Sequence, residues 1–215
     1  MKALHNLHDA ETVAARGADA VARELGAGAR TLVLAGGTTP RRCYELLASK
    51  PVRWGRVTVL FGDERCVAPD DPESNFRMAR EALLQRVYPA SVHRIPGELG
   101  PEEGARAYAV VVEALQPLDL VILGMGPDGH TASLFPGAPE LAVDGWAVGV
   151  RGAPKPPPER VSLTLGALRT ARRVIFLVTG ADKAAAVAKA VRGEVPAGML
   201  EQAEWFVDAA AAGTA

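Results

Sequence analysis

The chain has 215 residues, of which 48% are hydrophobic and 23% charged, and its formal net charge is −1 at pH 7. This length and composition suit one globular domain with a sizeable core, so we expect residues 1–215 to form a single domain, at most with a small α/β appendage. The near-zero charge argues against nucleic acid as a partner. A negatively charged ligand would have to be held by a few local groups.

Cysteine usage and the N-terminus bear on the compartment. Cys43 and Cys66 are too few and too unpatterned for a disulfide framework, which indicates a reducing interior. Asp9 and Glu11 precede any apolar run that would form a signal-peptide core, and no stretch approaches the roughly 18–20 apolar residues that cross a bilayer. We therefore expect a cytoplasmic protein without a membrane partner. A monomer is the simpler expectation, because no apolar helical stripe obviously exceeds what a core needs.

Short apolar, β-branched runs alternate along the chain with longer stretches of helical spacing. The expected strands are Thr31–Ala35, Val57–Phe61, Leu118–Leu123, Ala147–Val150, Val161–Thr164 and Val174–Val178. The expected helices are one from its N-cap Asp9 to Gly26, and others over Pro40–Ala48, Ser74–Gln85, Pro101–Leu115 and Lys183–Val191. This alternation predicts an open α/β fold, in which helices cover a mostly parallel sheet. The Ala-rich tail from Ala209 is predicted to be a frayed end.

Ligands of such sheets bind at the carboxyl ends of the strands, so the turns that follow strands are the candidate sites. The first turn is Gly36-Gly37-Thr38-Thr39-Pro40, where the glycines allow close backbone approach, Thr39 suits a helix cap and Pro40 suits the first helical position. Free N–H groups at that helix start, beside threonine hydroxyls, would cradle a phosphate. An ordinary strand–turn–helix connection explains the same residues equally well.

Three consecutive charges, Asp63, Glu64 and Arg65, follow the strand Val57–Phe61. They would bind a polar substrate, and the guanidinium of Arg65 suits phosphate. A solvated turn is the other interpretation of these charges. The neighbouring Cys66 would be a nucleophile only with a lowered thiol pKa, and we expect it to be a small apolar filler instead.

The glycine-rich run Gly124–Pro136, which reads GMGPDGHTASLFP, follows the strand Leu118–Leu123. It satisfies the dinucleotide pattern G-x-G-x-x-G literally. We reject a dinucleotide site, because Pro136 interrupts the helix which that site requires and no later strand ends in a suitably spaced acid. The pair Asp128 and His130 is more telling.

An imidazole is the side chain best matched to moving protons near neutral pH, and a nearby carboxylate orients it and stabilises its charged form. The alternative is a histidine satisfied by main-chain hydrogen bonds. Among three glycines at the ligand end of a sheet, we favour catalysis by His130 with Asp128 as its partner. Whether the two side chains meet depends on a bent backbone between them.

Lys183 follows the strand Val174–Val178 and is predicted in the first turn of a helix, where a cation opposes the helix dipole. Either an anion lies between this ammonium and the helix amides, or the lysine is simply solvated. Metal binding is not expected, because His5 and His8 lack nearby partners and neither H-E-x-x-H nor C-x-x-C is present.

Together these segments resemble the 6-phosphogluconolactonase family, which is related to the glucosamine-6-phosphate deaminases. The matching segments, in chain order, are Leu34–Pro40, Gly62–Arg65, Ser74–Met78, Gly124–Pro136, Pro154–Leu165 and Gly180–Lys183. The run Gly124–Pro136 is highly specific to the lactonase branch, whereas the first loop alone is not.

The resemblance implies a Rossmann-like three-layer fold and hydrolysis of 6-phospho-D-glucono-1,5-lactone to 6-phosphogluconate, in the oxidative pentose phosphate pathway and without a cofactor. It implies that His130 is the general base with Asp128 beside it. It places Gly37, Thr38, Arg65 and Lys183 where the family holds the sugar phosphate. The full set of residues expected to bind the substrate is Gly36, Gly37, Thr38, Thr39, Asp63, Arg65, Arg160 and Lys183.

Two other functions compete with lactone hydrolysis. The related branch carries out sugar-phosphate isomerisation and deamination with a carboxylate that follows the histidine in an Asn-Glu-Pro segment. Here that stretch reads Leu134-Phe135-Pro136, which lacks the acid. A non-catalytic sugar-phosphate sensor would need an attached DNA-binding segment or a basic helix, and neither is found in the 215 residues.

Overall fold

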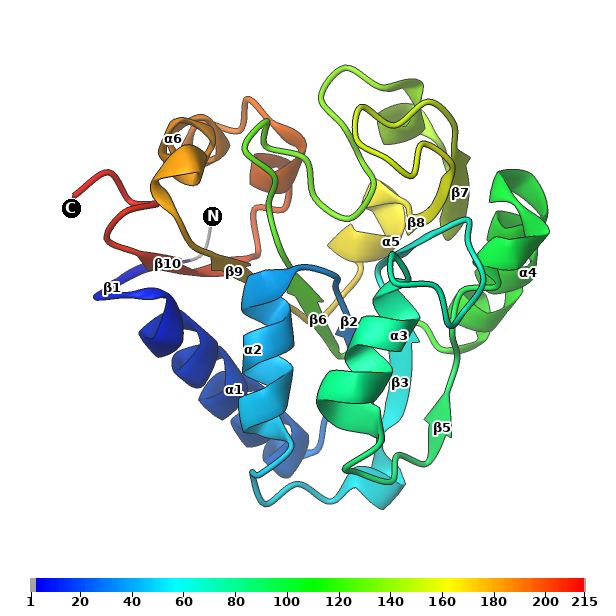
Figure 1. Cartoon of the computed structure of the whole chain (residues 1–215), viewed down its shortest axis with the longest axis horizontal. Coiled ribbons are helices and arrows are strands. Elements are labelled where there is room, and N and C mark those ends of the chain that lie inside the picture. The colour runs from blue at the N-terminus through cyan, green and yellow to red at the C-terminus, as the bar shows by residue number, and fades with distance from the viewer. Residues whose placement is uncertain (1–2, 215) are drawn as a thin grey trace.

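The computed structural model describes residues 3–214, which form two β-sheets and the helices that cover them (Figure 1). All strands of the larger, seven-stranded sheet run parallel, in the order β1-β10-β9-β6-β2-β3-β5. Their bounds are β1 Ala3–Leu7, β2 Thr31–Leu34, β3 Thr58–Phe61, β5 Ser91–Val92, β6 Leu120–Leu123, β9 Arg173–Val178 and β10 Glu204–Asp208. The smaller sheet is antiparallel, in the order β4-β8-β7, with β4 Asp63–Arg65, β7 Ala147–Val150 and β8 Arg160–Leu163.

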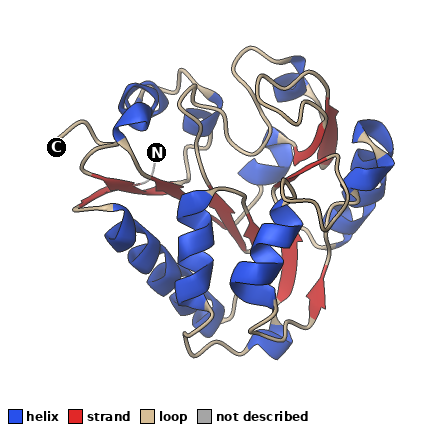
Figure 2. Cartoon of the chain, viewed as in Figure 1, coloured by secondary structure: helices blue, strands red, loops and turns tan. Residues whose placement is uncertain are grey.

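Helices flank the larger sheet on both faces. The α-helices are α1 Ala10–Ala27, α2 Thr38–Leu47, α3 Asn75–Ala79, α4 Pro101–Ala114, α5 Leu165–Arg169 and α6 Ala184–Val191. Figure 1 shows α1 and α6 on opposite sides of the part of the sheet that β1, β10 and β9 form, and Figure 2 shows helices on either side of the strands. The predicted α/β fold with a mostly parallel sheet is therefore confirmed.

Central strands are apolar throughout because both of their faces are covered. Every residue of β2 and of β6 is buried. Between the neighbouring strands β9 and β10, the ring of Phe176 stacks on that of Trp205 at a centroid distance of 4.0 Å, and both side chains are fully buried. This core holds the carboxyl ends of the strands in fixed positions.

The order of the strands creates a switch point between β2 and β6. From β2 the chain continues outward to β3 and β5, then returns to β6 on the other side of β2 and proceeds to β9 and β10. In open α/β sheets, ligands bind outside the carboxyl ends of the strands at such a point. The turns after β2 and β6 flank it, and the turns after β3 and β9 lie one strand further out.

Helix α1 begins where predicted and ends later. The Asp9 carboxylate accepts a hydrogen bond from the Thr12 N–H at 2.8 Å, as an N-cap does. The prediction that Gly26 ends the helix is wrong. Gly26 is helical, and the helix ends at Ala27 with Gly28 as its C-cap, whose φ of +119° is a left-handed conformation that favours glycine.

Near both ends of the chain the structure has a strand that was not predicted, and the C-terminal tail is not frayed. β1 and β10 pair at one edge of the larger sheet, and neither was expected. Beyond β10 the tail turns back on the protein: Ala211 is fully buried, and its N–H donates to Asp208 Oδ1 at 2.7 Å. The prediction of a frayed end from Ala209 is wrong, because this buried alanine and its hydrogen bond hold the tail in place.

Two of the six predicted strands exist but belong to the smaller sheet. β7 and β8 pair with each other in antiparallel fashion, and β8 also pairs with β4. The charged segment Asp63–Arg65, for which a solvated turn was one interpretation, is the edge strand β4 of this sheet. Helix α4 packs against β7 and β8. The smaller sheet thereby brings the Pro-rich loop before β8 over the carboxyl ends of the larger one.

Candidate active site

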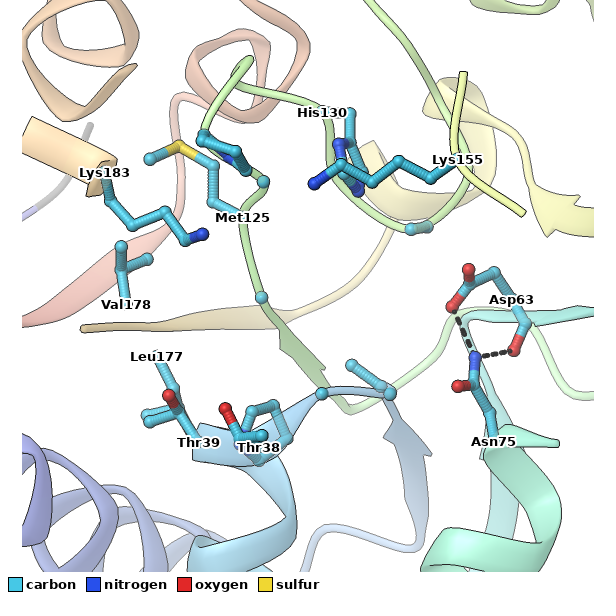
Figure 3. A pocket seen from close by; sticks show the side chains of 18 of the residues that line it. Thr38, Thr39, Asp63, Asn75, Met125, His130, Lys155, Leu177, Val178 and Lys183 are labelled. Carbon is cyan, nitrogen blue, oxygen red and sulfur yellow. Dashed lines mark hydrogen bonds between the residues drawn. The ribbon is translucent and has the colours of Figure 1, made fainter. Parts of the chain in front are cut away.

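A cavity of about 470 Å³ opens at the carboxyl ends of the adjacent strands β9, β6, β2 and β3. Figure 3 shows Lys183 and Thr38 on one side of it and His130 with Lys155 on the other. The structure brings together nearly every residue that the sequence suggested. The predicted residues that line the cavity are Gly36, Gly37, Thr38, Thr39, Asp63, Arg65, His130, Arg160 and Lys183. Asp128 stands behind His130.

The Asp128 and His130 side chains do meet. Asp128 Oδ1 lies 2.6 Å from His130 Nδ1 and also accepts the His130 backbone N–H at 3.2 Å. The hydrogen bonds between Gly126 N–H and His130 O (2.9 Å) and between Gly129 N–H and Gly126 O (3.0 Å) close the turn that bends the backbone. Residues two apart are thus brought face to face, the condition on which the predicted pairing depended.

Glycines at two positions of this turn are a geometric requirement. A Cβ on Gly126 would lie 2.1 Å from His130 Nδ1 and 2.5 Å from Asp128 Oδ1. Gly129 has a φ of +87°, and a Cβ there would lie 2.6 Å from Val195. Two glycines of the G-x-G-x-x-G match are therefore explained by the packing around Asp128 and His130. A dinucleotide site is not needed to explain them.

Burial and charge act on the imidazole in opposite directions. Burial lowers the pKa of His130 below its ordinary value, while the hydrogen bond and the charge of Asp128 act to raise it. For Asp128, burial acts to raise the pKa, but the hydrogen bond from His130 and the charge interaction with it leave the pKa lowered. An ionised Asp128 accepts from Nδ1–H, which leaves the lone pair on Nε2 of a neutral ring. The side chain of His130 is 16% exposed, so a small molecule can reach it.

Asp63 lines the cavity but is engaged by the protein. Its Oδ2 accepts the Ser133 hydroxyl at 2.7 Å, and its Oδ1 accepts the Asn75 amide at 3.1 Å. Asp63 is only 6% exposed. It therefore ties the turn after His130 to the β4 segment, and its availability to a substrate is smaller than the sequence suggested.

Glu64 is buried and structural. Burial raises the pKa of its carboxyl group, but the N–H groups of Phe76, Asn75 and Arg65 and the Ser74 hydroxyl all donate to it. It holds the start of α3 against β4. The run of three charges after β3 thus contains one substrate candidate, Arg65, beside two carboxylates that organise the site.

Helix α2, which follows the turn after β2, begins two residues earlier than predicted. Helix α2 starts at Thr38, and its N-cap is Gly37 with a φ of +109° and no side-chain cap, so the prediction of Thr39 as the cap is wrong. The Thr39 hydroxyl instead bonds that of Thr179 at 2.7 Å, which links the turns that follow β2 and β9. A Cβ on Gly36 would lie 2.0 Å from Asn75 Oδ1, so Gly36 is needed for close approach. Thr38 and Thr39 line the cavity, and uncapped N–H groups at a helix start are suited to bind an anion.

The two cations that were expected to hold a phosphate, Lys183 and Arg65, line the same cavity as that helix start. Lys183 lines the cavity from a 3₁₀ turn, Ala181–Lys183, and precedes α6 rather than lying in its first turn as predicted. Its Nζ pairs with Asp182 at 2.7 Å. The turn is held by Asp208, whose carboxylate oxygens both lie 3.1 Å from the Gly180 N–H. Arg65 binds the Glu73 carbonyl at 2.6 Å through one guanidinium nitrogen, whereas its buried Nε has no partner among residues 3–214.

Arg160 lines the cavity and also organises the Pro-rich loop. Its Nε donates to the Pro157 carbonyl at 3.0 Å and its Nη2 to the Lys155 carbonyl at 2.8 Å. The loop in turn presents Lys155 to the cavity, near enough to His130 to affect its pKa. Lys155 and Asn75 were not predicted as site residues, although both lie in segments of family resemblance.

The structure also bears on Cys66, on metal-binding groups and on long apolar helices. Burial raises the pKa of the Cys66 thiol to about 11, and Cys66 does not line the cavity, so it is no activated nucleophile. Within the described part of the chain, no group of three or more His, Cys, Asp and Glu side chains is placed to hold a metal ion. Over the same residues, no helix has the length and hydropathy to traverse a bilayer.

Comparisons with known proteins find sequence similarity over most of the chain. The profile of the family "Glucosamine-6-phosphate isomerases/6-phosphogluconolactonase" matches residues 7–207. The chain is 40% identical to 6-phosphogluconolactonase of Streptomyces coelicolor, over 86% of this chain and 82% of that one. It is 38% identical to the Mycobacterium leprae enzyme of the same name, over 84% and 83%.

Solved structures give the same result. A crystal structure of 6-phosphogluconolactonase from Thermotoga maritima is 30% identical, covers 97% of this chain and 100% of that one, and superposes with a TM-score of 0.89. A monomeric glucosamine-6-phosphate deaminase is 22% identical with a TM-score of 0.86, which is a likeness of fold alone. The chain belongs to the glucosamine-6-phosphate isomerase/6-phosphogluconolactonase family.

Proposed function

We propose that the protein hydrolyses 6-phospho-D-glucono-1,5-lactone to 6-phosphogluconate, as the names of its relatives suggest. The observation that carries the proposal is an imidazole oriented by a carboxylate at 2.6 Å. It faces a cavity that is also lined by the start of α2 and by the ammonium group of Lys183. Lys183, Arg65 and the N–H groups of Thr38 and Thr39 hold the phosphate, and His130 meets the lactone end. The cytoplasmic location and the monomeric state stay predictions.

The reaction needs one group that moves a proton in both directions. Nε2 of His130 takes a proton from water as the water oxygen bonds to the lactone carbonyl carbon. The π electrons of the carbonyl group move to the carbonyl oxygen, which becomes negatively charged. When the carbonyl re-forms, the bond to the ring oxygen breaks and the imidazolium returns the proton to that oxygen. Asp128 stabilises the imidazolium in between. The ester is already activated, so proton transfer is the main assistance required.

The neighbourhood of His130 disfavours isomerase or deaminase chemistry. The Phe135 ring lies 4.6 Å from the imidazole, centroid to centroid, and Leu134 is fully buried. The segment after His130 thus contributes apolar packing where the related branch is expected to carry an acid. Ammonia release from glucosamine 6-phosphate would reverse this conclusion.

The proposal is tested by lactone opening with and without protein, after subtraction of the spontaneous rate. We expect His130→Asn to lower kcat by roughly 10²–10⁴, the usual contribution of an acid–base residue. His93→Asn is the matched control, because His93 lies outside the cavity and its replacement should leave kcat unchanged. Near-wild-type turnover of folded His130→Asn would remove His130 from this role. A strong preference for phosphorylated over unphosphorylated lactone is expected as well.

A further inference from the structure

The turn that follows His130 contains a strained alanine. Thr131 and Leu134 exchange two backbone hydrogen bonds, of 3.3 and 2.9 Å, so that Ala132 and Ser133 occupy the middle of a two-residue turn. Ala132 has a φ of +48° and is the one non-glycine residue with a positive φ among residues 3–214. A left-handed conformation is unfavourable for an L-residue, and glycine is usual at such positions.

The backbone N–H groups of this turn can be assigned one by one. The His130 N–H donates to Asp128 Oδ1, that of Ser133 to Ser162 Oγ at 3.2 Å, and those of Thr131 and Leu134 to each other's carbonyl groups. The Ala132 N–H has no acceptor within the described chain. Ala132 lines the cavity and is only partly exposed. A backbone N–H without a protein partner, on a residue that lines the cavity, is free to donate to a bound molecule.

We propose that the Ala132 N–H donates to the oxygen that becomes negatively charged when water adds to the lactone carbonyl, and so makes Ala132 a catalytic residue. The inference rests on the proposed function, because it needs a carbonyl carbon within reach of His130. Ala132 stands two residues after the general base, so one short segment would supply both the base and the oxyanion donor. The donor bonds strengthen as charge develops on the oxygen.

Contacts on both sides of Ala132 fix the turn before the reaction begins. The Ser133 hydroxyl donates to Asp63 Oδ2 at 2.7 Å, and the Thr131 hydroxyl donates to the Gly124 carbonyl at 3.0 Å. Both residues are fully buried. These anchors explain why a strained φ persists at Ala132, and they give Asp63 the role of a positioning residue. A donor that need not reorganise is what oxyanion stabilisation requires.

The direct test removes this N–H and keeps every side chain. Replacement of Ala132 by its α-hydroxy acid, lactic acid, converts the amide to an ester and keeps the methyl group. We expect kcat to fall about 10²–10³-fold, the effect of losing one oxyanion donor. Binding of 6-phosphogluconate should change little, because the donor acts in the transition state. Unchanged kcat in the ester variant would overturn the inference.

Two controls separate the donor from the turn. The ester variant at Ala132 also weakens the hydrogen bond from the Leu134 N–H to the Thr131 carbonyl. Replacement of Leu134 by its α-hydroxy acid removes that hydrogen bond alone, and we expect it to lower kcat by less than about threefold. Ala132→Gly keeps the N–H but removes the methyl group, so it should lose far less kcat than the ester variant. An equal loss in either control would assign the effect to the turn or to the methyl group, against the proposal. A wild-type protein that opens no lactone would instead refute the proposed function.

Discussion

His130 owes its reactivity to a balance between burial and one hydrogen bond. Burial keeps the imidazole neutral, and Asp128 opposes that by stabilising the protonated form. The net pKa is lowered, so the base form persists at pH values below the ordinary pKa of histidine, about 6.5. The carboxylate raises the basicity of the imidazole against the effect of burial, and it also orients the ring and stabilises the imidazolium.

Replacement of Asp128 by asparagine should therefore have two effects. The acidic limb of the profile of kcat/KM against pH should move to lower pH, because the group that raises the pKa of His130 is lost. The plateau value of kcat should fall by about 10²-fold or more, because Nδ1 is no longer oriented by a charged acceptor. The profile, with the spontaneous rate subtracted at each pH, measures both. A limb that moves to higher pH would contradict this account of the pair.

The glycine between the pair and the strand offers a sharper substitution. In Gly126→Ala the new methyl group would overlap both His130 Nδ1 and Asp128 Oδ1, so the imidazole must move away from its carboxylate. We expect kcat to fall by about 10²-fold or more, while the far-UV circular dichroism spectrum is kept. Gly26→Ala in α1 is the control, because a Cβ there has open space within 4 Å and should stabilise the helix by about 0.5–1 kcal/mol. Equal activities of the two variants would show that the tight fit at Gly126 is unimportant.

At the scale of elements, the sequence predicted the strands that carry the site. β2, β3, β6 and β9 are short apolar runs, because both faces of the sheet are covered, and each is followed by the turn that the strand-end rule singled out. The pairing of Asp128 with His130 could only be named as a possibility. It depends on a backbone bend and on the space that Gly126 leaves.

Two of the strands that were not predicted, β1 and β4, lack the short apolar run that marks a buried strand. β4 consists of three charged residues, and its stability comes from Glu64 and Asp63 accepting hydrogen bonds from segments distant in sequence. β1 is only partly buried and pairs at an edge. β10 did carry a signal, the apolar run Trp205-Phe206-Val207. Lys155 lies at the site because Arg160 binds the carbonyl groups of its loop. No pattern in the neighbouring sequence predicts this contact.

That loop gives a prediction about an element. Arg160→Lys keeps the charge but loses the planar guanidinium that serves the carbonyl groups of Lys155 and Pro157. We expect unfolding in urea to show a loss of about 1–3 kcal/mol, the cost of leaving buried hydrogen-bonding groups unpaired, and faster amide hydrogen exchange in the loop. Arg151→Lys is the control, because its ion pairs are exposed and should change stability by under about 1 kcal/mol. Equal losses in both would deny Arg160 this anchoring role.

At the scale of the whole molecule, the cavity joins segments from nearly the full length of the chain. Thr38 follows β2, His130 follows β6, and Lys183 follows β9, so the site exists only when the sheet is complete. Asp208 extends the dependence to the last strand, since its carboxylate holds the Gly180 turn. The unfolded chain cannot gather these groups, and a ligand that binds them must stabilise the fold.

The size of that stabilisation follows from mass action. At a concentration of 6-phosphogluconate 100 times its Kd, the free energy of unfolding should rise by about 2.7 kcal/mol, which corresponds to a rise in Tm of roughly 5–10 °C for a chain of this length. Gluconate, which lacks the phosphate, should give little shift at the same concentration. Lys183→Met should abolish most of the shift, because Lys183 lines the cavity, whereas Lys189→Met on the exposed side of α6 should keep it. Only the phosphorylated ligand carries the charge that the wall of the cavity at the start of α2 attracts. If gluconate gives the same shift, or if the shift persists in Lys183→Met, the ligand is not held there by its phosphate.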